Sequence, residues 1–160
     1  MVIDREIITQ SAQETQKLGE ELGDWIRKKV NGKRQKGREE SVATVICLYG
    51  ELGSGKTTFA QGFAKALSVT TRLLSPTFII VRRYQSEKLT GFLYHLDLYR
   101  AGGEKDLPGL GLPEILADSD SVVLIEWAEK LGNLLPKERI DARFSVMKEE
   151  KHSISICKIS

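Results

Sequence analysis

The sequence predicts an α/β fold in which a mostly parallel central sheet is flanked by helices and ends in a C-terminal antiparallel hairpin. Two apolar runs, TVICLYG at 44–50 and SVVLIEW at 121–127, have the composition of buried parallel strands. The first run passes through a glycine-rich turn into KTTFAQGFAKAL at 56–67, which has helical periodicity. The C-terminal segments IDARFSVMK and HSISICKI alternate apolar and polar residues on either side of a turn at KEEK, as the strands of a hairpin do.

The N-terminal part predicts an edge strand, an amphipathic helix and a basic loop. REIIT precedes SAQE, in which Ser11 and Glu14 form a capping-box pair. Apolar residues then recur at spacings of three and four, which predicts a helix over 12–30. These residues are Leu18, Leu22, Trp25, Ile26 and Val30. The polar, basic segment 31–41 predicts a mobile surface loop, which is either a contact for nucleic acid or a partner, or a solvated run of charge.

Between the two apolar runs, the sequence predicts two more strands and a short helix. Ser75 and Pro76 interrupt the chain, and FIIVRRY resumes as a strand. GFLYHLDLYR follows, with His95 and Asp97 two residues apart and therefore on one face of an extended segment. LPGLGLPEILADSD contains a short helix at most.

Composition indicates a single domain over residues 1–160, since 160 residues with 41% hydrophobic content are too few for a second large core. The net charge of +2 is too small for nucleic-acid binding across the whole surface, although it permits a local basic patch. Cys47 and Cys157 belong to no Cys/His cluster, so we expect packing residues in a reducing compartment and no zinc site. Because no segment resembles a signal peptide or a membrane span, we expect a cytoplasmic protein without a membrane partner.

The segment GELGSGKT at 50–57 matches the pattern G-x-x-x-x-G-K-[ST] that binds nucleotide phosphates. In this pattern, backbone N–H groups of the turn point at phosphate oxygens and lead into a helix N-terminus. Lys56 supplies charge to the outer phosphates, and Thr57 offers its hydroxyl to Mg²⁺. We expect Lys56 to face solvent, with the nucleotide as its partner. An ordinary glycine-rich turn would not require the order strand, turn, helix that the sequence has here.

A nucleotidase with this loop also needs an acid at the end of a neighbouring apolar strand, opposite the loop threonine. Glu126 closes VVLIE, and Asp97 follows FLYHL. We assign Glu126 to the metal together with Thr57. Asp97 would then orient or deprotonate the attacking water, unless it simply pairs with Arg100.

Three classes of function are compatible with such a loop: an ATPase, a small-molecule kinase with Asp97 as base, and a nucleotide-dependent adaptor without useful turnover. The sequence contains no second Arg-rich segment of the kind that closes over two substrates in kinases, which favours the ATPase. Thr77 follows a proline and has the position of a switch hydroxyl that senses the γ-phosphate, although Ser-Pro-Thr is also ordinary turn chemistry.

Taken together, GELGSGKTT, SPTF, HLDLYR and IEW resemble, in order and spacing, the bacterial TsaE family over nearly the whole chain. The resemblance implies a three-layer fold similar to that of other P-loop NTPases. It also implies a Mg²⁺-dependent ATPase, weak in isolation, that supports formation of the threonylcarbamoyl group on adenosine 37 of tRNAs reading codons beginning with A. The expected partners are homologues of TsaD and TsaB, with tRNA contacted through the complex.

The resemblance further implies roles for individual residues. ATP would be bound by Glu51, Leu52, Gly53, Ser54, Gly55, Lys56, Thr57 and Thr58, and Mg²⁺ by Thr57 and Glu126. Catalytic roles fall to Lys56, Thr77, Asp97 and Glu126, while Trp127 stands at the family's tryptophan and Ser11 to Thr15 lie near the adenine. The sequence departs from the family at Glu51, where Asp is more usual, and in the length of the 31–41 loop, but neither departure removes a catalytic group.

Overall fold

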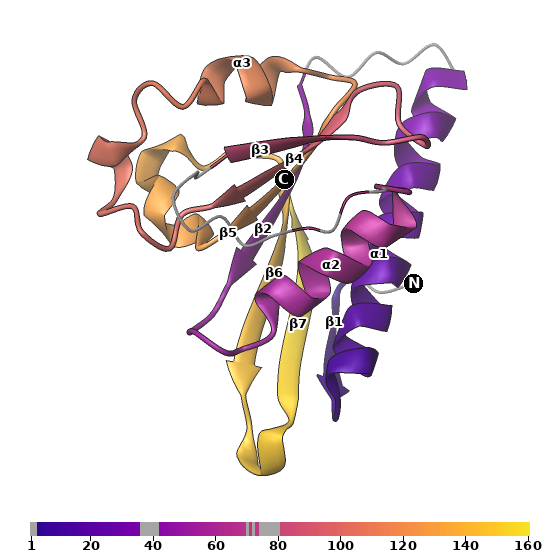
Figure 1. Ribbon diagram of the computed structural model, residues 1–160, viewed down its shortest axis with the longest axis vertical. Helices are drawn as coiled ribbons and strands as arrows, with labels where there is room; N and C mark the ends of the chain where they lie inside the picture. The colour runs from indigo at the N-terminus through magenta and orange to yellow at the C-terminus, as the bar shows by residue number, and fades with distance from the viewer. Residues whose placement is uncertain (1–2, 36–41, 70, 72, 74–80) are drawn as a thin grey trace.

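The computed structural model describes residues 3–35, 42–69, 71, 73 and 81–160 of the chain. Within them, a seven-stranded sheet has the strand order β1-β7-β6-β2-β5-β4-β3 (Figure 1). The strands are β1 (Arg5–Thr9), β2 (Thr44–Tyr49), β3 (Val81–Gln85), β4 (Phe92–Asp97), β5 (Val122–Glu126), β6 (Arg139–Val146) and β7 (His152–Ile159). The helices are α1 (Ala12–Gln35), α2 (Lys56–Ala66) and α3 (Leu112–Ala117), with shorter 3-10 turns at Glu104–Asp106, Ala128–Leu134 and Lys148–Glu150.

The sheet is mixed, with a parallel centre and antiparallel edges. Strands β6, β2, β5 and β4 run parallel to one another. β7 and β1 add antiparallel pairs on the β6 side, and β3 adds one next to β4. The predicted α/β fold with its parallel central strands, the edge strand REIIT and the C-terminal hairpin are confirmed, and the antiparallel pair of β3 with β4 is a further feature of the sheet.

Helices cover both faces of this sheet, which gives three layers (Figure 1). Along β2, Ile46 and Leu48 point to the face covered by α1 and α2, while Val45 and Cys47 point to the face covered by α3 and the Ala128–Leu134 turn. The predicted apolar stripe of α1 lies in the first core. Cys47 is buried in the second core, and Cys47 and Cys157 are both free thiols.

One element boundary differs from the sequence-based prediction. Helix α1 continues to Gln35 and does not end at 30, so the predicted basic loop is helical over its first residues. Among the side chains that the structure describes, Val30 is the last residue of this helix in the core, and the helical backbone continues beyond it. The remainder of that loop, 36–41, and the 74–80 segment, which includes Thr77 and the start of FIIVRRY, lie outside the described residues. Among the described helices, none combines the length and the apolar character needed to cross a bilayer.

Helices α1 and α2 approach each other at three glycines, Gly19, Gly23 and Gly62. A Cβ added at Gly62 would lie 1.9 Å from the carbonyl oxygen of Gln16, and one added at Gly19 would lie 2.1 Å from that of Phe59. Both neighbours are backbone atoms, which cannot move aside as a flexible side chain can. The close contact of the two helices therefore depends on the absence of side chains at these positions, and it fixes α2 and the loop that precedes it.

Replacing Gly62 with alanine should accordingly destabilise the fold by about 1–3 kcal/mol, because the helices must separate to admit the new Cβ. Gly32 is the matched control, since a Cβ at this helical glycine would meet nothing within 4 Å. Gly32→Ala should stabilise the chain by up to about 1 kcal/mol through helix propensity. Urea unfolding of both variants measures the difference, and equal stabilities would contradict the close-packed crossing.

Candidate nucleotide-binding site

A cleft of about 600 Å³ opens at the carboxyl ends of the parallel strands β2, β4 and β5. Ligands of open α/β sheets bind at this edge, and the volume suits a small-molecule ligand. The cleft is lined by the 52–58 loop and by residues of β4, β5, the start of α1 and the C-terminal hairpin. The lining residues outside the loop are Gln10, Ser11, Ala12, Thr15, Asp97, Tyr99, Glu126, Trp127, Val146, Glu150 and His152.

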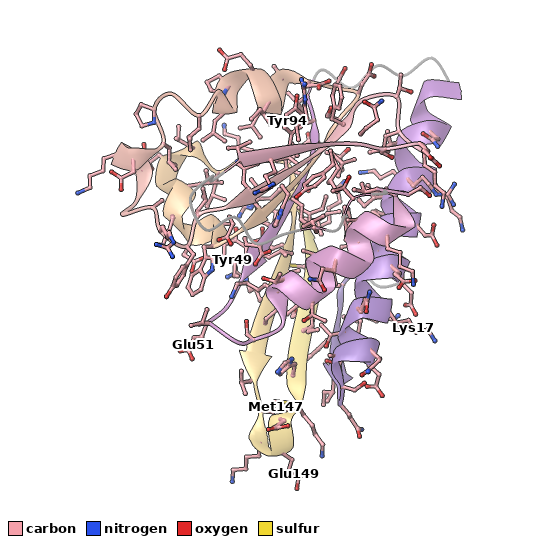
Figure 2. The ribbon with its side chains drawn as sticks, in the orientation of Figure 1. Lys17, Tyr49, Glu51, Tyr94, Met147 and Glu149 are labelled. Atoms are coloured by element: carbon pink, nitrogen blue, oxygen red, sulfur yellow. The ribbon has the colours of Figure 1, made fainter. Side chains whose placement is uncertain are left out.

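The phosphate loop, residues 50–57, joins β2 to α2 and depends on glycine at two places. Gly55 caps α2 with a left-handed conformation, φ 98° and ψ 5°, and a Cβ there would lie 2.9 Å from Nδ1 of His152. Gly50 packs against β6, where a Cβ would come within 2.5 Å of the carbonyl oxygen of Phe144. A loop held in this way ends at the N-terminus of an 11-residue helix, α2, which favours negative charge. Figure 2 shows Glu51 at the outer bend of the loop, with an exposed side chain.

The Lys56 side chain is buried, whereas we predicted that it would face solvent. Its side chain is 4% exposed, and Nζ donates to the carbonyl oxygens of Gly50 at 2.6 Å and Glu51 at 2.8 Å. The ammonium also lies 4.2 Å from the ring centre of Trp127, within the range of a cation–π interaction. Burial lowers the pKa of Lys56, while the charges of Glu126, Glu129 and Asp97 oppose that shift. The Lys56 ammonium is thus bound by the backbone carbonyl groups of its own loop.

Glu126 lies at the centre of a buried hydrogen-bonded cluster. The hydroxyl of Thr57 donates to its Oε2 at 2.9 Å, and His95 Nε2 lies 2.9 Å from its Oε1. Glu126 is 2% exposed and His95 is fully buried. The structure therefore brings together the two residues that we assigned to the metal, and it adds a histidine that the sequence analysis noted without giving it a role.

Asp97 stands beside Glu126, since the two residues are register partners on the parallel strands β4 and β5. Its Oδ1 accepts a hydrogen bond from the backbone N–H of Tyr99 at 3.0 Å. Asp97 is 9% exposed and lines the cleft. Both predicted acids thus end neighbouring strands at the same level, where their side chains reach one ligand site.

The far side of the cleft is built by residues distant from the phosphate loop in sequence. Ser11 and Thr15, from the segment expected near the adenine, line it, and the Thr15 hydroxyl bonds to that of Thr9 at 2.7 Å. His152 and Val146 come from the C-terminal hairpin, whose tip carries Met147 and Glu149 (Figure 2). No local motif marked the hairpin residues, because only the pairing of β6 with β2 brings the hairpin to the loop. The sequence analysis therefore missed them.

Trp127 and Tyr99 form an aromatic wall next to the phosphate loop. Their ring centres are 5.2 Å apart, and Trp127 has a left-handed backbone conformation with φ 59°. This conformation is unusual for a bulky residue and is maintained by the structure around it. The Lys130 ammonium donates to the carbonyl oxygen of Tyr99 and lies 5.7 Å from each ring. These contacts hold the two rings in place beside the Lys56 ammonium.

The residues of the cleft fit a nucleotide with Mg²⁺. Mg²⁺ prefers oxygen ligands and commonly takes one or two from protein, with phosphates and water completing its shell. The Thr57 hydroxyl and the Glu126 carboxylate are such ligands, and they meet at the end of the phosphate loop. Among the described residues, no group of three or more His, Cys, Asp or Glu side chains is arranged to hold a metal by itself. A metal here would thus depend on the phosphates.

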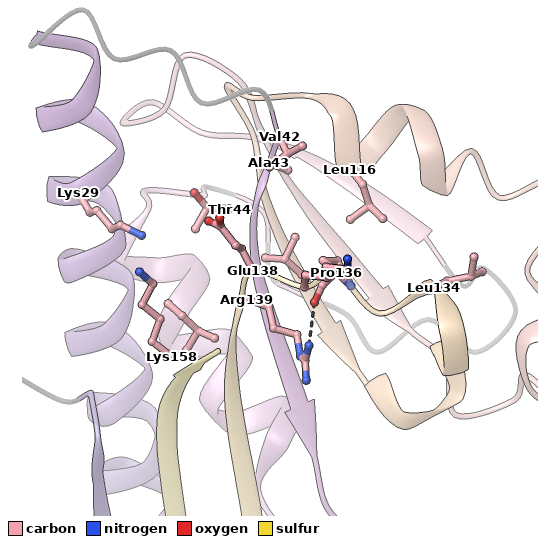
Figure 3. Close-up of a pocket in the computed structure, with 13 residues that line it drawn as sticks. Lys29, Val42, Ala43, Thr44, Leu116, Leu134, Pro136, Glu138, Arg139 and Lys158 are labelled. Carbon is pink, nitrogen blue, oxygen red and sulfur yellow. Dashed lines mark hydrogen bonds between the residues drawn. The ribbon is translucent and has the colours of Figure 1, made fainter. Parts of the chain in front are cut away.

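A second hollow, of about 540 Å³, lies at the opposite end of the sheet, where β2 and β6 begin (Figure 3). Val42, Leu116, Leu134 and Pro136 give it an apolar wall, and Lys29 and Lys158 stand at its other side (Figure 3). Arg139 is engaged within the protein, since it donates to the carbonyl oxygen of Pro136 and to the Asp141 carboxylate, both at 2.8 Å. This hollow contains no counterpart of the phosphate loop or the pair of acids.

Comparisons with known proteins agree with this geometry. The model of the family described as "Threonylcarbamoyl adenosine biosynthesis protein TsaE" matches residues 9–154. The tRNA threonylcarbamoyladenosine biosynthesis protein TsaE of Bacillus subtilis is 44% identical over 96 residues, which are 60% of this chain and 58% of that protein. Its namesake in Aquifex aeolicus is 37% identical over 128 residues, 79% of this chain and 78% of that protein. The crystal structure of Bacillus subtilis YdiB superposes with a TM-score of 0.72 at 26% identity, covering 100% of this chain and 88% of that one.

Proposed function

We propose a function for this chain from one premise, that it belongs to the TsaE family of threonylcarbamoyl adenosine biosynthesis proteins. Its role accordingly lies in the biosynthesis of threonylcarbamoyladenosine in tRNA. Within that role, the chain binds ATP with Mg²⁺ in the cleft beside the phosphate loop and hydrolyses the ATP. It does so as the ATPase subunit of a multiprotein complex that places the threonylcarbamoyl group on adenosine 37 of tRNAs reading codons beginning with A.

The observation that carries this proposal is the meeting of three groups at one edge of the sheet. Thr57, at the end of the phosphate loop, bonds to Glu126, and Asp97 lies beside Glu126 on the next strand. A phosphate cradle, a metal carboxylate and a second acid are the parts that a nucleotide hydrolase requires. A site built for binding alone would not need the second acid.

Each of these residues has a separate part in the chemistry. The loop amides and Lys56 bind and orient the phosphates, and the cation–π contact of the Lys56 ammonium with Trp127 keeps that charge at the loop. Thr57 and Glu126 would hold Mg²⁺, which supplies positive charge against the phosphate oxygens when it is bound. Asp97 accepts a hydrogen bond from the attacking water and orients it. It takes the proton as the water oxygen bonds to the γ-phosphorus and the bond from that phosphorus to the bridging oxygen of ADP breaks, so that ADP and phosphate leave. For Thr77, we propose the role of a hydroxyl that senses the γ-phosphate.

The partners that we propose are homologues of TsaD and TsaB, with tRNA reached through them. Large apolar side chains are exposed around the cleft, notably Leu52 at 72%, Val146 at 54% and Tyr99 at 47%. Apolar groups gathered at the mouth of a cleft are typical of a surface that another protein covers. A protein that works with tRNA in this complex belongs in the cytoplasm.

Measuring phosphate release tests this proposal directly. The purified chain with Mg²⁺ and ATP, alone and with the TsaD and TsaB homologues, should release phosphate slowly alone and faster in their presence. A small-molecule kinase would transfer the phosphate to a metabolite and release little of it. An adaptor would bind ATP and release no phosphate under either condition, which would contradict the proposed hydrolysis.

The variant Lys56→Met should weaken ATP binding at least about tenfold, because it removes the charge for the outer phosphates and keeps a stem of similar length over Trp127. Titration with a fluorescent ATP analogue measures the loss. Lys65→Met is the matched control on the same helix, since Lys65 is exposed and pairs with Glu20. Equal affinities of Lys56→Met and the unchanged chain, with both folded, would remove the phosphate-loop assignment.

A further inference from the structure

His95 is the buried group of the site whose contribution the proposed hydrolysis leaves unexplained. It lies on β4, two residues before Asp97, and its side chain has 0% exposure. Its Nε2 lies 2.9 Å from Oε1 of Glu126. Its Nδ1 is buried as well and has no hydrogen-bond partner among the described residues. Among the described residues, Glu126 is therefore the hydrogen-bond partner of the His95 ring.

The direction of that hydrogen bond follows from the chemistry of the two groups. An ionised carboxylate only accepts hydrogen bonds, so Nε2 carries the proton and donates it to Oε1. Thr57 donates to the other oxygen, Oε2, at 2.9 Å. Each carboxylate oxygen of Glu126 thus has its own donor, and the plane of the carboxylate is fixed from both sides.

The two donors are not equivalent with respect to a metal. Thr57 is itself a magnesium ligand in the proposed function, so its lone pairs would turn to the metal while its O–H can still donate to Oε2. His95 lies on the opposite side of the carboxylate and can keep its bond to Oε1. Without His95, Oε1 of Glu126 would lose the donor that the described structure gives it, and the carboxylate would be held through Oε2 alone although its last torsion is broad for Glu.

We propose that His95 is the positioning residue of the magnesium site, which orients the Glu126 carboxylate by donating from Nε2 to Oε1 so that Oε2 faces the metal beside Thr57. This inference rests on the proposed Mg²⁺–nucleotide binding and adds the residue that organises it. Hydrogen-bond partners of metal ligands commonly contribute 10–100-fold to metal affinity. His95 does not itself touch the metal or the nucleotide.

The test measures metal dependence without turnover. Binding of fluorescent ADP is recorded as free Mg²⁺ is raised, and again in EDTA. In His95→Leu, which removes the donor, the Mg²⁺ concentration for half-maximal effect should rise by about 10–100-fold. The affinity measured in EDTA should stay unchanged, because the loop amides and Lys56 are untouched. If His95 only filled the core, its replacement would weaken ADP binding to the same extent with Mg²⁺ and in EDTA.

Two further variants keep the test decisive if leucine at a buried site prevents folding. His95→Gln places an amide N–H donor at a reach similar to that of Nε2, and should restore Mg²⁺ dependence close to that of the unchanged chain. His95→Asn remains polar but is too short to reach Oε1, and should behave as the leucine variant is expected to. Thermal unfolding of each variant establishes that the folded state is compared.

A double-variant comparison isolates the proposed route through Glu126. In a Glu126→Gln background, replacing His95 with asparagine should cause no further loss of Mg²⁺ dependence, since the group that it orients is already removed. Wild-type Mg²⁺ dependence in folded His95→Asn, or an additive loss in the double variant, would overturn the positioning role. Absence of Mg²⁺-dependent ADP binding in the unchanged chain would instead overturn the proposed function.

Discussion

Asp97→Asn should lower the rate of ATP hydrolysis by about two to four orders of magnitude and leave Mg²⁺-dependent ATP binding nearly unchanged. An amide cannot take the proton of the attacking water, although it retains an oxygen that can accept the N–H of Tyr99 as Asp97 does now. The substitution is close to isosteric, so local packing persists. Single-turnover phosphate release measures the rate, and titration with a non-hydrolysable ATP analogue measures the binding.

Glu126→Gln should fail differently, because Glu126 is bonded to Thr57 and His95 rather than directed at a water molecule. Loss of its charge should weaken Mg²⁺-dependent binding first and turnover as a consequence. Glu129→Gln serves as the control. Glu129 contributes charge to the surroundings of Lys56 but does not line the cleft. If Asp97→Asn loses Mg²⁺ dependence and Glu126→Gln retains it, the roles of the two acids are reversed.

The parts of the site that could be predicted are those encoded by neighbours in the chain. The phosphate loop follows from the order strand, glycine-rich turn, helix within a short segment, and the structure forms each of these elements. Glu126 was identified because an acid closes an apolar run. Its adjacency to Asp97 depends on the pairing of β4 with β5. Sequence periodicity can indicate that two strands exist and that each ends on an acid, but not that they are neighbours.

The features that could not be predicted are set by packing between distant segments. His152 reaches the cleft because strand β6 of the hairpin pairs with β2. No local sequence pattern predicts this pairing. The burial of Lys56 results from loop carbonyls and the ring of Trp127 closing around it, whereas the motif describes the lysine by the ligand it binds. The antiparallel direction of β3 next to β4 was not predicted either, because periodicity indicates a strand but not its direction in the sheet.

For the proposed hydrolysis, we expect the isolated chain to need groups that a partner supplies. The described residues that line the cleft include no arginine. Among them, Lys56 is the side chain that carries a full positive charge at the phosphate loop. The cleft is also open to solvent along a rim of apolar side chains that includes Leu52 and Val146. An added arginine and exclusion of water can each change such rates by orders of magnitude. Both can be supplied by a protein that covers the rim.

Adding the TsaD and TsaB homologues should therefore raise ATP hydrolysis by this chain at least about 100-fold, since the partner would cover the cleft and complete its charge. In the proposed complex the bound nucleotide and the partner meet at the same surface, so each should strengthen binding of the other by the same factor. Calorimetry with and without a non-hydrolysable ATP analogue measures this coupling, and Lys56→Met, which weakens nucleotide binding, should abolish it. Thr77→Ala should reduce the coupling while sparing ATP binding, if its hydroxyl reports the γ-phosphate to the partner. Association that is indifferent both to the nucleotide and to Thr77→Ala would remove the switch role and leave hydrolysis without a means of driving the complex.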